Sequence, residues 1–156
     1  MRVEVRESVL ITASPEQVFD FVASEQGFLS FSGFGPIPGL KQVVFERGSY
    51  QRVGSESRVT NTDGSTHRER IVECQRPHRF AVVIHDLSPP FGKLVTEIDE
   101  LWQVVGEPTG SRLSRSFAFQ LRSPLLWPLS LLLVQVLFRG AMRRHHRVLA
   151  SRLGRW

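Results

Sequence analysis

The chain has 156 residues, 41% hydrophobic and 22% charged, and this size and composition predict one globular domain over residues 1–156. Its single cysteine, Cys74, excludes an intrachain disulfide and fits a reducing, cytoplasmic compartment. The net charge is +5, but six of the 20 Lys and Arg residues lie in residues 139–156, which contain no acid. The rest of the chain therefore holds 14 basic and 15 acidic residues, without the broad basic face of a nucleic-acid-binding domain, and we expect no nucleic-acid partner.

The N-terminal part of the chain predicts a strand followed by a short helix. Apolar and charged residues alternate between Val3 and Ile11, which indicates a strand with one buried face and lacks the apolar centre of a signal peptide. Ser14 followed by Pro15 is typical of a helix start, because serine caps the first turn and proline fits its first position. We expect one helix there and a second short helical turn near residues 28–31.

Six further strands are expected at about 40–47, 53–60, 67–75, 79–87, 94–105 and 111–121. Turn residues such as Asp63-Gly64 and Arg76-Pro77 separate them, so the pattern predicts an antiparallel meander. The segment 33–39 before these strands has the composition of a loop. Its glycine spacing matches no phosphate-binding motif, and its two prolines remove backbone donors.

The C-terminal part of the chain predicts one long helix. Ser123-Pro124 begins a helical region, and a regular helix from Pro128 to Leu153 would be about 39 Å long. Residues 125–138 are apolar on almost every side, yet this run is shorter than the ~20 residues that a membrane span needs. We therefore expect a buried or interfacial helix, which continues into the arginine-rich end of the chain.

Three segments carry a resemblance to a known family. Residues 9–22 hold a strand followed by Ser-Pro-Glu-Gln-Val-Phe; residues 53–58 precede Asp63-Gly64 and Glu69-Arg70-Ile71; and residues 110–113 lead into Phe117-Ala118-Phe119 and the last helix. In this order they resemble the helix-grip superfamily (SRPBCC) of START domains and the plant pollen-allergen fold, and within it the polyketide cyclase/dehydrase-like family. The resemblance spans essentially the whole chain.

The resemblance implies an α+β helix-grip fold. In it, a curved antiparallel seven-stranded sheet wraps around a long C-terminal helix, with one or two short helices after the first strand. It also implies a ligand cavity between the sheet and that helix. The activity stays open, because this superfamily contains lipid carriers, cyclases and ligand sensors, and a fold does not establish a function.

Two charged residues are expected to face the cavity from neighbouring strands. If Asp63 and Gly64 form a two-residue hairpin turn, Arg58 lies directly opposite Glu69 on one face of the sheet. The apolar row of the next strand, which contains Val82, would continue this face and make it the concave one. The pair would then orient a carbonyl, hydroxyl or carboxylate group of a ligand, or else form only an ion pair at the rim of the sheet.

Other candidates come from single positions. Arg115 stands in an apolar row, where it would either meet a polar ligand group or extend its head into solvent. Candidate cavity walls, each equally compatible with core packing, are Phe21, Phe31, Val82, Trp102, Phe117, Phe119 and Leu133. His67 could act as an acid or base beside Glu69, but we expect it to be solvated near the turn. No residues have a recognised metal spacing, so neither a metal nor a cofactor is expected.

The function that we favour is non-catalytic binding or transport of a small hydrophobic molecule, such as a lipid, a polyketide or an isoprenoid-like compound. One alternative is a polyketide cyclase, aromatase or dehydratase in which Arg58 and Glu69 polarise a carbonyl and move a proton. A second is membrane-surface or partner binding through the arginine-rich C-terminal helix. The sequence leaves open the ligand, catalysis and the choice between monomer and homodimer.

Overall fold

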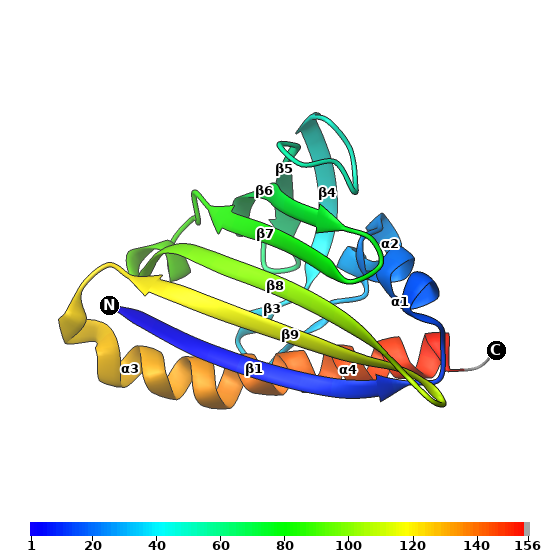
Figure 1. The fold of residues 1–156 in the computed structure, drawn as a ribbon. Coiled ribbons are helices and arrows are strands. Elements are labelled where there is room, and N and C mark those ends of the chain that lie inside the picture. Colours follow the sequence, from blue (N-terminus) through cyan, green and yellow to red (C-terminus); the bar gives the residue numbers. More distant parts are fainter. Residues whose placement is uncertain (155–156) are drawn as a thin grey trace.

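The structure, a computed structural model, describes residues 1–154 and consists mainly of one antiparallel sheet and one long helix (Figure 1). Arg155, one of the six C-terminal arginines, lies outside the described residues. The seven strands are β1 (Arg2–Ile11), β4 (Leu40–Arg47), β5 (Glu56–Asn61), β6 (Thr66–Gln75), β7 (Arg79–His85), β8 (Val95–Glu107) and β9 (Gly110–Leu121). Their order is β1-β9-β8-β7-β6-β5-β4, so the predicted sheet and its meander are confirmed.

Two short helices follow the first strand, as predicted: α1 (Pro15–Val22) and α2 (Glu25–Leu29). The start of α1 is a capping box, in which Ser14 Oγ accepts from the amide of Gln17 at 3.2 Å and the Gln17 side chain accepts from the Ser14 amide at 3.0 Å. Ser24 caps α2 in a similar way, because its side chain accepts from the Gly27 amide at 3.2 Å.

The segment predicted as a loop forms a small hairpin of β2 (Gly33–Phe34) and β3 (Ile37–Pro38). Gly33 has a φ of +78°, and a Cβ atom at this position would lie 2.2 Å from the carbonyl oxygen of Ile37. Only glycine fits both the backbone conformation and this close approach. The hairpin packs against the long helix, where Gly140 leaves room for the ring of Phe34.

The long helix runs continuously through four segments: η2 (Pro124–Leu126), α3 (Trp127–Leu132), the π-helical η3 (Leu133–Phe138) and α4 (Arg139–Leu153). It lies along β1 (Figure 1), where Gln135 donates to the carbonyl oxygen of Glu4 at 2.8 Å and Arg139 contacts Glu7 at 2.6 Å. By length and mean hydropathy the helix is apolar enough to cross a membrane. One such helix is weak evidence for a membrane span, because the core helix of a soluble protein meets the same criteria.

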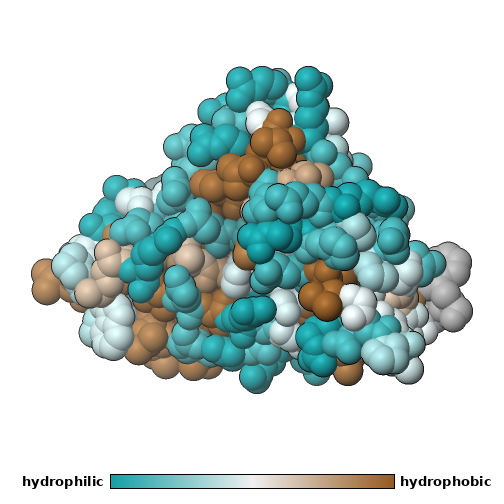
Figure 2. All heavy atoms as spheres, in the orientation of Figure 1, coloured by the Kyte–Doolittle hydropathy of each residue, from teal (hydrophilic) through white to brown (hydrophobic). Residues whose placement is uncertain are grey.

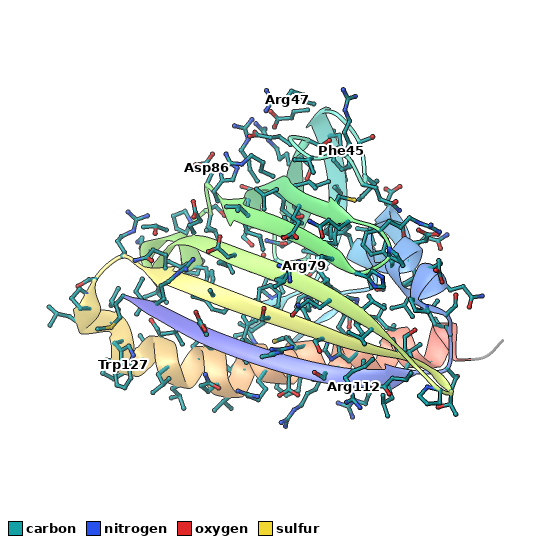
Figure 3. The ribbon with its side chains drawn as sticks, viewed as in Figure 1. Phe45, Arg47, Arg79, Asp86, Arg112 and Trp127 are labelled. Atoms are coloured by element: carbon teal, nitrogen blue, oxygen red, sulfur yellow. The ribbon has the colours of Figure 1, made fainter. Side chains whose placement is uncertain are left out.

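The hydrophobic core lies between the inner face of the sheet, α1 and the long helix. Its largest fully buried side chains are Phe19, Phe80, Phe119, Ile11, Leu113, Met142 and Leu149. The outer face is largely hydrophilic (Figure 2) and carries ion pairs such as Arg79 with Glu73 and Arg112 with Glu107. Figure 3 labels Arg79 and Arg112. This contrast follows from the period of two along each strand, which sends successive side chains to opposite faces.

The register between β5 and β6 differs from the predicted one. Arg58 lies opposite Arg68, and Ser57 lies opposite Glu69, so the predicted pairing of Arg58 with Glu69 is wrong. The turn has three residues, because Asp63 accepts from the amide and hydroxyl of Ser65 and Gly64 adopts a φ of +84°. One extra residue in the turn shifts the pairing by one, and a shift by one sends Arg58 to the outer face.

Candidate ligand-binding site

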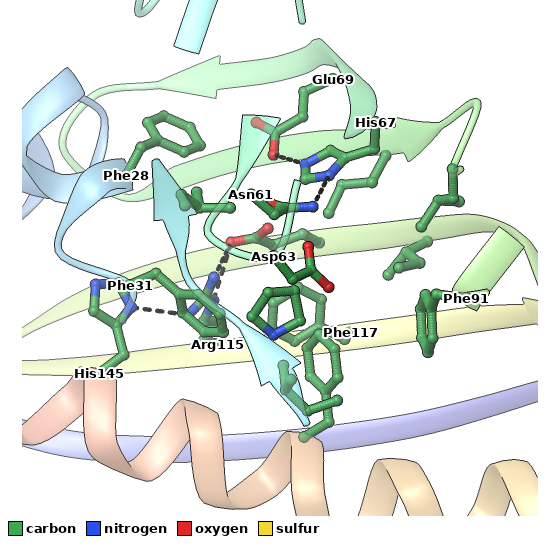
Figure 4. A pocket seen from close by; sticks show the side chains of 18 of the residues that line it. Phe28, Phe31, Asn61, Asp63, His67, Glu69, Phe91, Arg115, Phe117 and His145 are labelled. Carbon is green, nitrogen blue, oxygen red and sulfur yellow. Dashed lines mark hydrogen bonds and ion pairs between the residues drawn. The ribbon is translucent and has the colours of Figure 1, made fainter. Parts of the chain in front are cut away.

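A cavity of about 260 Å³ lies between the inner face of the sheet, α2, the β2–β3 hairpin and the long helix (Figure 4). Its apolar lining includes Phe28, Phe31, Ile84, Leu87, Phe91, Leu94, Ile98, Phe117, Leu133 and Phe138. The titratable lining residues are Asp63, His67, Glu69, Glu100, Arg115 and His145. A mostly apolar wall with a few convergent polar groups is the usual composition of a small-molecule site.

One polar group of the lining consists of Asn61, His67 and Glu69. Because side chains alternate along β6, His67 and Glu69 both point inward, and they are 8% and 5% exposed. Nε2 of His67 lies 3.0 Å from Oε1 of Glu69, and Nδ1 lies 3.3 Å from Nδ2 of Asn61. An amide nitrogen only donates, so Nδ1 accepts and the Nε2 proton is donated to the carboxylate. This is a neutral histidine held between an amide and an acid.

The position of His67 differs from the solvated one that the sequence suggested. His67 and Glu69 are two residues apart on β6 and share its inner face, and His67 lies opposite Val59, which is completely buried. His67 therefore lies on the inner face rather than at the solvated end of a hairpin. Its Nε2 proton and the Glu69 carboxylate then form a hydrogen-bonded acid–base pair inside an apolar cavity. The sequence pattern allowed this pair but favoured a solvated His67.

The second polar group is built around Arg115 on β9. Its Nε donates to Oε1 of Glu100 on β8 at 3.0 Å, and its Nη2 lies 2.8 Å from the same oxygen. Its guanidinium lies 4.1 Å from the ring centre of Trp102 and 4.5 Å from that of Phe117. Burial raises the pKa of Glu100, and the charge of Arg115 works against that rise. Two guanidinium nitrogens within 3.0 Å of one carboxylate oxygen favour an ion pair in this buried position.

His145 connects this ion pair to α2. Nη1 of Arg115 lies 3.0 Å from Nδ1 of His145, and Nε2 lies 2.6 Å from Oγ of Ser30, which in turn lies 2.6 Å from the carbonyl oxygen of Gly27. Arginine only donates, so Nδ1 accepts, the Nε2 proton goes to Ser30, and Ser30 donates to the carbonyl. Burial, followed by the charge of Arg115, lowers the pKa of His145 to about 2. His145 is therefore neutral and ties the long helix to the sheet and to α2.

The cavity brings together half of the predicted ligand contacts: Glu69, Trp102, Arg115 and Phe117 line it. Val82 and Phe119 are buried in the core and Phe21 packs against that core, and these three lie outside the lining. Arg58 lies on the outer face with a 63% exposed side chain and contacts Glu46 at 3.2 Å, so its predicted place on the cavity face is wrong.

Sequence reasoning missed Asn61, Glu100 and His145 as lining residues. A signal existed for Glu100, because it shares the period of two with Ile98 and Trp102 along one strand. No local pattern marks Asn61, whose inward position depends on the turn length. Within residues 1–154 no group of three or more metal-ligating side chains occurs.

An open seven-stranded sheet that packs on a long C-terminal helix around a mostly apolar cavity defines a helix-grip domain of the ligand-binding type. A protein-family model described as "Polyketide cyclase / dehydrase and lipid transport" matches residues 2–154. The chain therefore belongs to this family, and the family resemblance noted in the sequence is confirmed. A comparison with curated protein sequences gives no match.

Solved structures show the same fold at low sequence identity. Ginseng major latex-like protein 151 from Panax ginseng is 11% identical, with a TM-score of 0.72 and coverage of 98% of both chains. The di-domain ARO/CYC StfQ from the steffimycin biosynthetic pathway is 16% identical, with a TM-score of 0.71 over 99% of this chain and 51% of that chain. A norcoclaurine synthase mutant from Thalictrum, in complex with a transition-state analogue, is 12% identical, with a TM-score of 0.68 over 98% and 94%.

Proposed function

We propose that the chain binds and carries a small, mostly apolar molecule in the cavity between the sheet and the long helix, without catalysis. The observation that supports this is the lining itself: aromatic and aliphatic side chains surround about 260 Å³, and most of the polar groups belong to two hydrogen-bonded sets. This volume lies just below the ~300–1,000 Å³ that is usual for small-molecule sites, which favours a compact ligand. Lipids, polyketides and isoprenoid-like compounds are the classes that we expect.

Ligand binding is tested by filling the cavity from one strand. Ile84 and Val83 are neighbours on β7, and only Ile84 lines the cavity. Replacing Ile84 by tryptophan should weaken the binding of an apolar fluorescent probe at least tenfold, whereas Val83→Trp on the outer face should leave it unchanged. Equal binding by both variants would show that the probe binds elsewhere. Native mass spectrometry of the purified protein would then identify any molecule that copurifies.

A second candidate function is proton-transfer chemistry of the cyclase or dehydratase type. The observation that favours it is the buried His67–Glu69 hydrogen bond within the cavity, because an acid or base must reach the substrate within hydrogen-bond distance. Arg58 takes no part in this candidate. Replacing Glu69 by glutamine should abolish turnover of a polyketide-like ketone while substrate binding persists, and unchanged turnover would remove Glu69 from the mechanism.

A third candidate, contact with a membrane surface, is supported by the outer face of the long helix. Leu125, Leu129, Leu132 and Val136 recur at helical spacing and are 90%, 54%, 63% and 55% exposed. Figure 2 shows brown, hydrophobic residues along the lower left edge, where Figure 1 places α3. Single exposed leucines are common, but a continuous row of this kind marks a binding surface.

The charge along the same helix favours an anionic bilayer as the partner. Residues 123–138 contain no charged side chain, and α4 then exposes Arg143, Arg144 and Arg147. Trp127, 41% exposed, lies at the other end of the apolar row, and tryptophan is enriched at membrane interfaces. An apolar face with adjacent arginines is the composition of helices that lie in the plane of an anionic interface.

Membrane contact is tested by flotation with vesicles of phosphatidylcholine and phosphatidylglycerol at low and high salt. Leu132→Glu should reduce vesicle binding at least fivefold. Leu10→Glu is the matched control, because Leu10 is 60% exposed on β1, close to the 63% of Leu132. If the wild-type protein does not bind vesicles, the proposal is contradicted. It is also contradicted if the wild-type protein is a dimer that does not bind vesicles and that Leu132→Glu dissociates.

A further inference from the structure

The polar side of the cavity carries an excess of hydrogen-bond acceptors and negative charge. We infer that the ligand donates hydrogen bonds at its polar end and carries no negative charge there, as an alcohol, a phenol or a protonated amine does. This inference rests on the proposed ligand-binding function and adds the chemical class of the ligand. Figure 4 shows the groups that decide it: Asn61, Asp63, His67 and Glu69 lie together on one side, and Arg115 lies against His145.

The charges of the lining do not balance. Three lining carboxylates, of Asp63, Glu69 and Glu100, face one guanidinium, of Arg115, and both lining histidines are neutral by their hydrogen bonds. The lining therefore has a formal charge of −2, of which the exposed Asp63 at the rim contributes −1. Arg115, the lining cation, is already paired with Glu100.

Arg115 is the one lining residue with a permanent positive charge, and Glu100 already compensates that charge. Each of its three guanidinium nitrogens has a partner: Nε and Nη2 contact Glu100, and Nη1 contacts His145. Its side chain is 7% exposed, with the rings of Trp102 and Phe117 against the guanidinium. A ligand carboxylate would have to compete with Glu100 for this charge, and two buried carboxylates would then share one counterion.

The polar groups around Glu69 have acceptor oxygens without a donor from the protein. Oε1 of Glu69 accepts the His67 proton, and within the described residues Oε2 accepts no hydrogen bond from the protein. Asn61 uses its amide nitrogen for Ser65 and His67, which leaves its carbonyl oxygen as an acceptor. Asp63 lies exposed at the rim of the cavity, where Oδ1 accepts two hydrogen bonds from Ser65. A hydroxyl or ammonium group supplies the donors that the buried oxygens of Asn61 and Glu69 need.

One lining donor lacks a partner, and it does not change this conclusion. Nε1 of Trp102 is buried and makes no hydrogen bond with another described residue. A ligand oxygen can therefore also accept from the indole, as the oxygen of an alcohol or phenol does. The indole N–H is a neutral donor, however, and does not compensate the desolvation of a carboxylate.

The test compares three ten-carbon probes that share one chain and differ at the end: decylamine, decanol and decanoate. Each competes with a neutral fluorescent probe bound to the full chain at pH 7.5, below its micelle-forming concentration. We expect decanol and decylamine to displace the probe at concentrations at least tenfold lower than decanoate. The comparison uses wild-type protein, so it does not depend on the folding of any variant.

A pair of charge-matched variants locates the effect. Glu69→Gln removes one negative charge from the lining and should reduce the preference for decylamine over decanoate at least threefold. Glu46→Gln removes the same charge on the outer face, where Glu46 contacts Arg58 and Arg68, and should leave the preference unchanged. An equal effect of both variants would attribute the preference to the net charge of the protein and overturn the inference.

The outcomes separate this inference from the proposed function. If decanoate displaces the probe as well as decanol does, the cavity binds ligands but its polar side does not select donors, and only the inference is overturned. If the fluorescent probe and all three ten-carbon compounds fail to bind, the proposed ligand-binding function fails and the inference falls with it.

Discussion

Replacing Arg115 by methionine should lower the free energy of unfolding by about 3–5 kcal/mol, the usual cost of removing one partner from a buried ion pair. The variant loses a hydrogen bond to Glu100 at 3.0 Å, the ion-pair contact at 2.8 Å and a hydrogen bond to His145 at 3.0 Å. Glu100 is 4% exposed, so its carboxylate is left without a counterion and without water. For a chain of this length, such a loss corresponds to a decrease in Tm of roughly 10 °C.

The same variant should lose stability as the pH rises. Burial raises the pKa of Glu100, and Arg115 opposes this rise in the wild-type protein. Without Arg115 the pKa rises further, so the folded variant retains a proton that the unfolded chain releases above about pH 4.3. Its stability is fully present below that pH and falls as the pH rises toward the raised pKa of the folded state. The wild-type protein should show a shallower decrease.

Urea unfolding at pH 5 and pH 8 measures both effects through the midpoint and the slope of the transition. Arg112→Met is the matched control, because Arg112 lies on the same strand and contacts Glu107 at 2.9 Å but is 48% exposed. That control should change stability by no more than about 1 kcal/mol. If Arg115→Met costs no more than the control, or if its pH dependence parallels the wild type, the reasoning about a buried ion pair is refuted.

Two further predictions concern acid and the hairpin. Burial lowers the pKa values of His145 and His146 to about 2 and about 3, so below about pH 6.5 the unfolded chain binds protons that the folded chain does not. As the pH decreases below this value, the free energy of unfolding should fall by about 1.4 kcal/mol per pH unit for each histidine. Urea unfolding of His146→Gln should show about half of that slope, and an unchanged slope would contradict it. Gly33→Ala should cost more than Gly64→Ala in thermal unfolding, because both have a positive φ but only Gly33 faces a backbone oxygen at 2.2 Å. Gly64→Ala should lower the free energy of unfolding by about 1–2 kcal/mol through the backbone conformation alone. Equal losses for the two variants would show that the β2–β3 hairpin moves to accommodate the added methyl group.

Most of the fold could be predicted because its signals are local. The alternation along each strand, the turn residues between strands and the Ser14 cap all depend on neighbours in the sequence. The length and apolar character of the last helix then require that one of its faces be buried, and the concave face of the sheet is the surface that can bury it. The π-helical turn at Leu133–Phe138 follows no local signal, because such turns depend on packing.

The candidate site was only partly predictable, because its polar residues depend on distances between segments. One extra residue in the turn near Asp63 exchanges the inner and outer rows of β5, so Arg58 moves out and Asn61 moves in. Glu69 was identified as the expected cross-strand partner of Arg58, and Arg115 as a charge in an apolar row. Their actual partners, His67 and Glu100, follow from register and side-chain geometry, which composition and spacing do not determine.

The chain of hydrogen bonds from β9 to α2 also explains why a cavity persists here. Arg115, His145 and Ser30 connect the sheet, the long helix and α2 in series, and each bond requires its neighbours at a fixed distance. Apolar side chains at these positions would gain by closing the space, because packed cores leave few voids. A buried ion pair is often no more stabilising than apolar residues of the same volume, so stability alone does not explain this one. A framework that holds the helix away from the sheet next to an apolar wall is what a binding cavity requires.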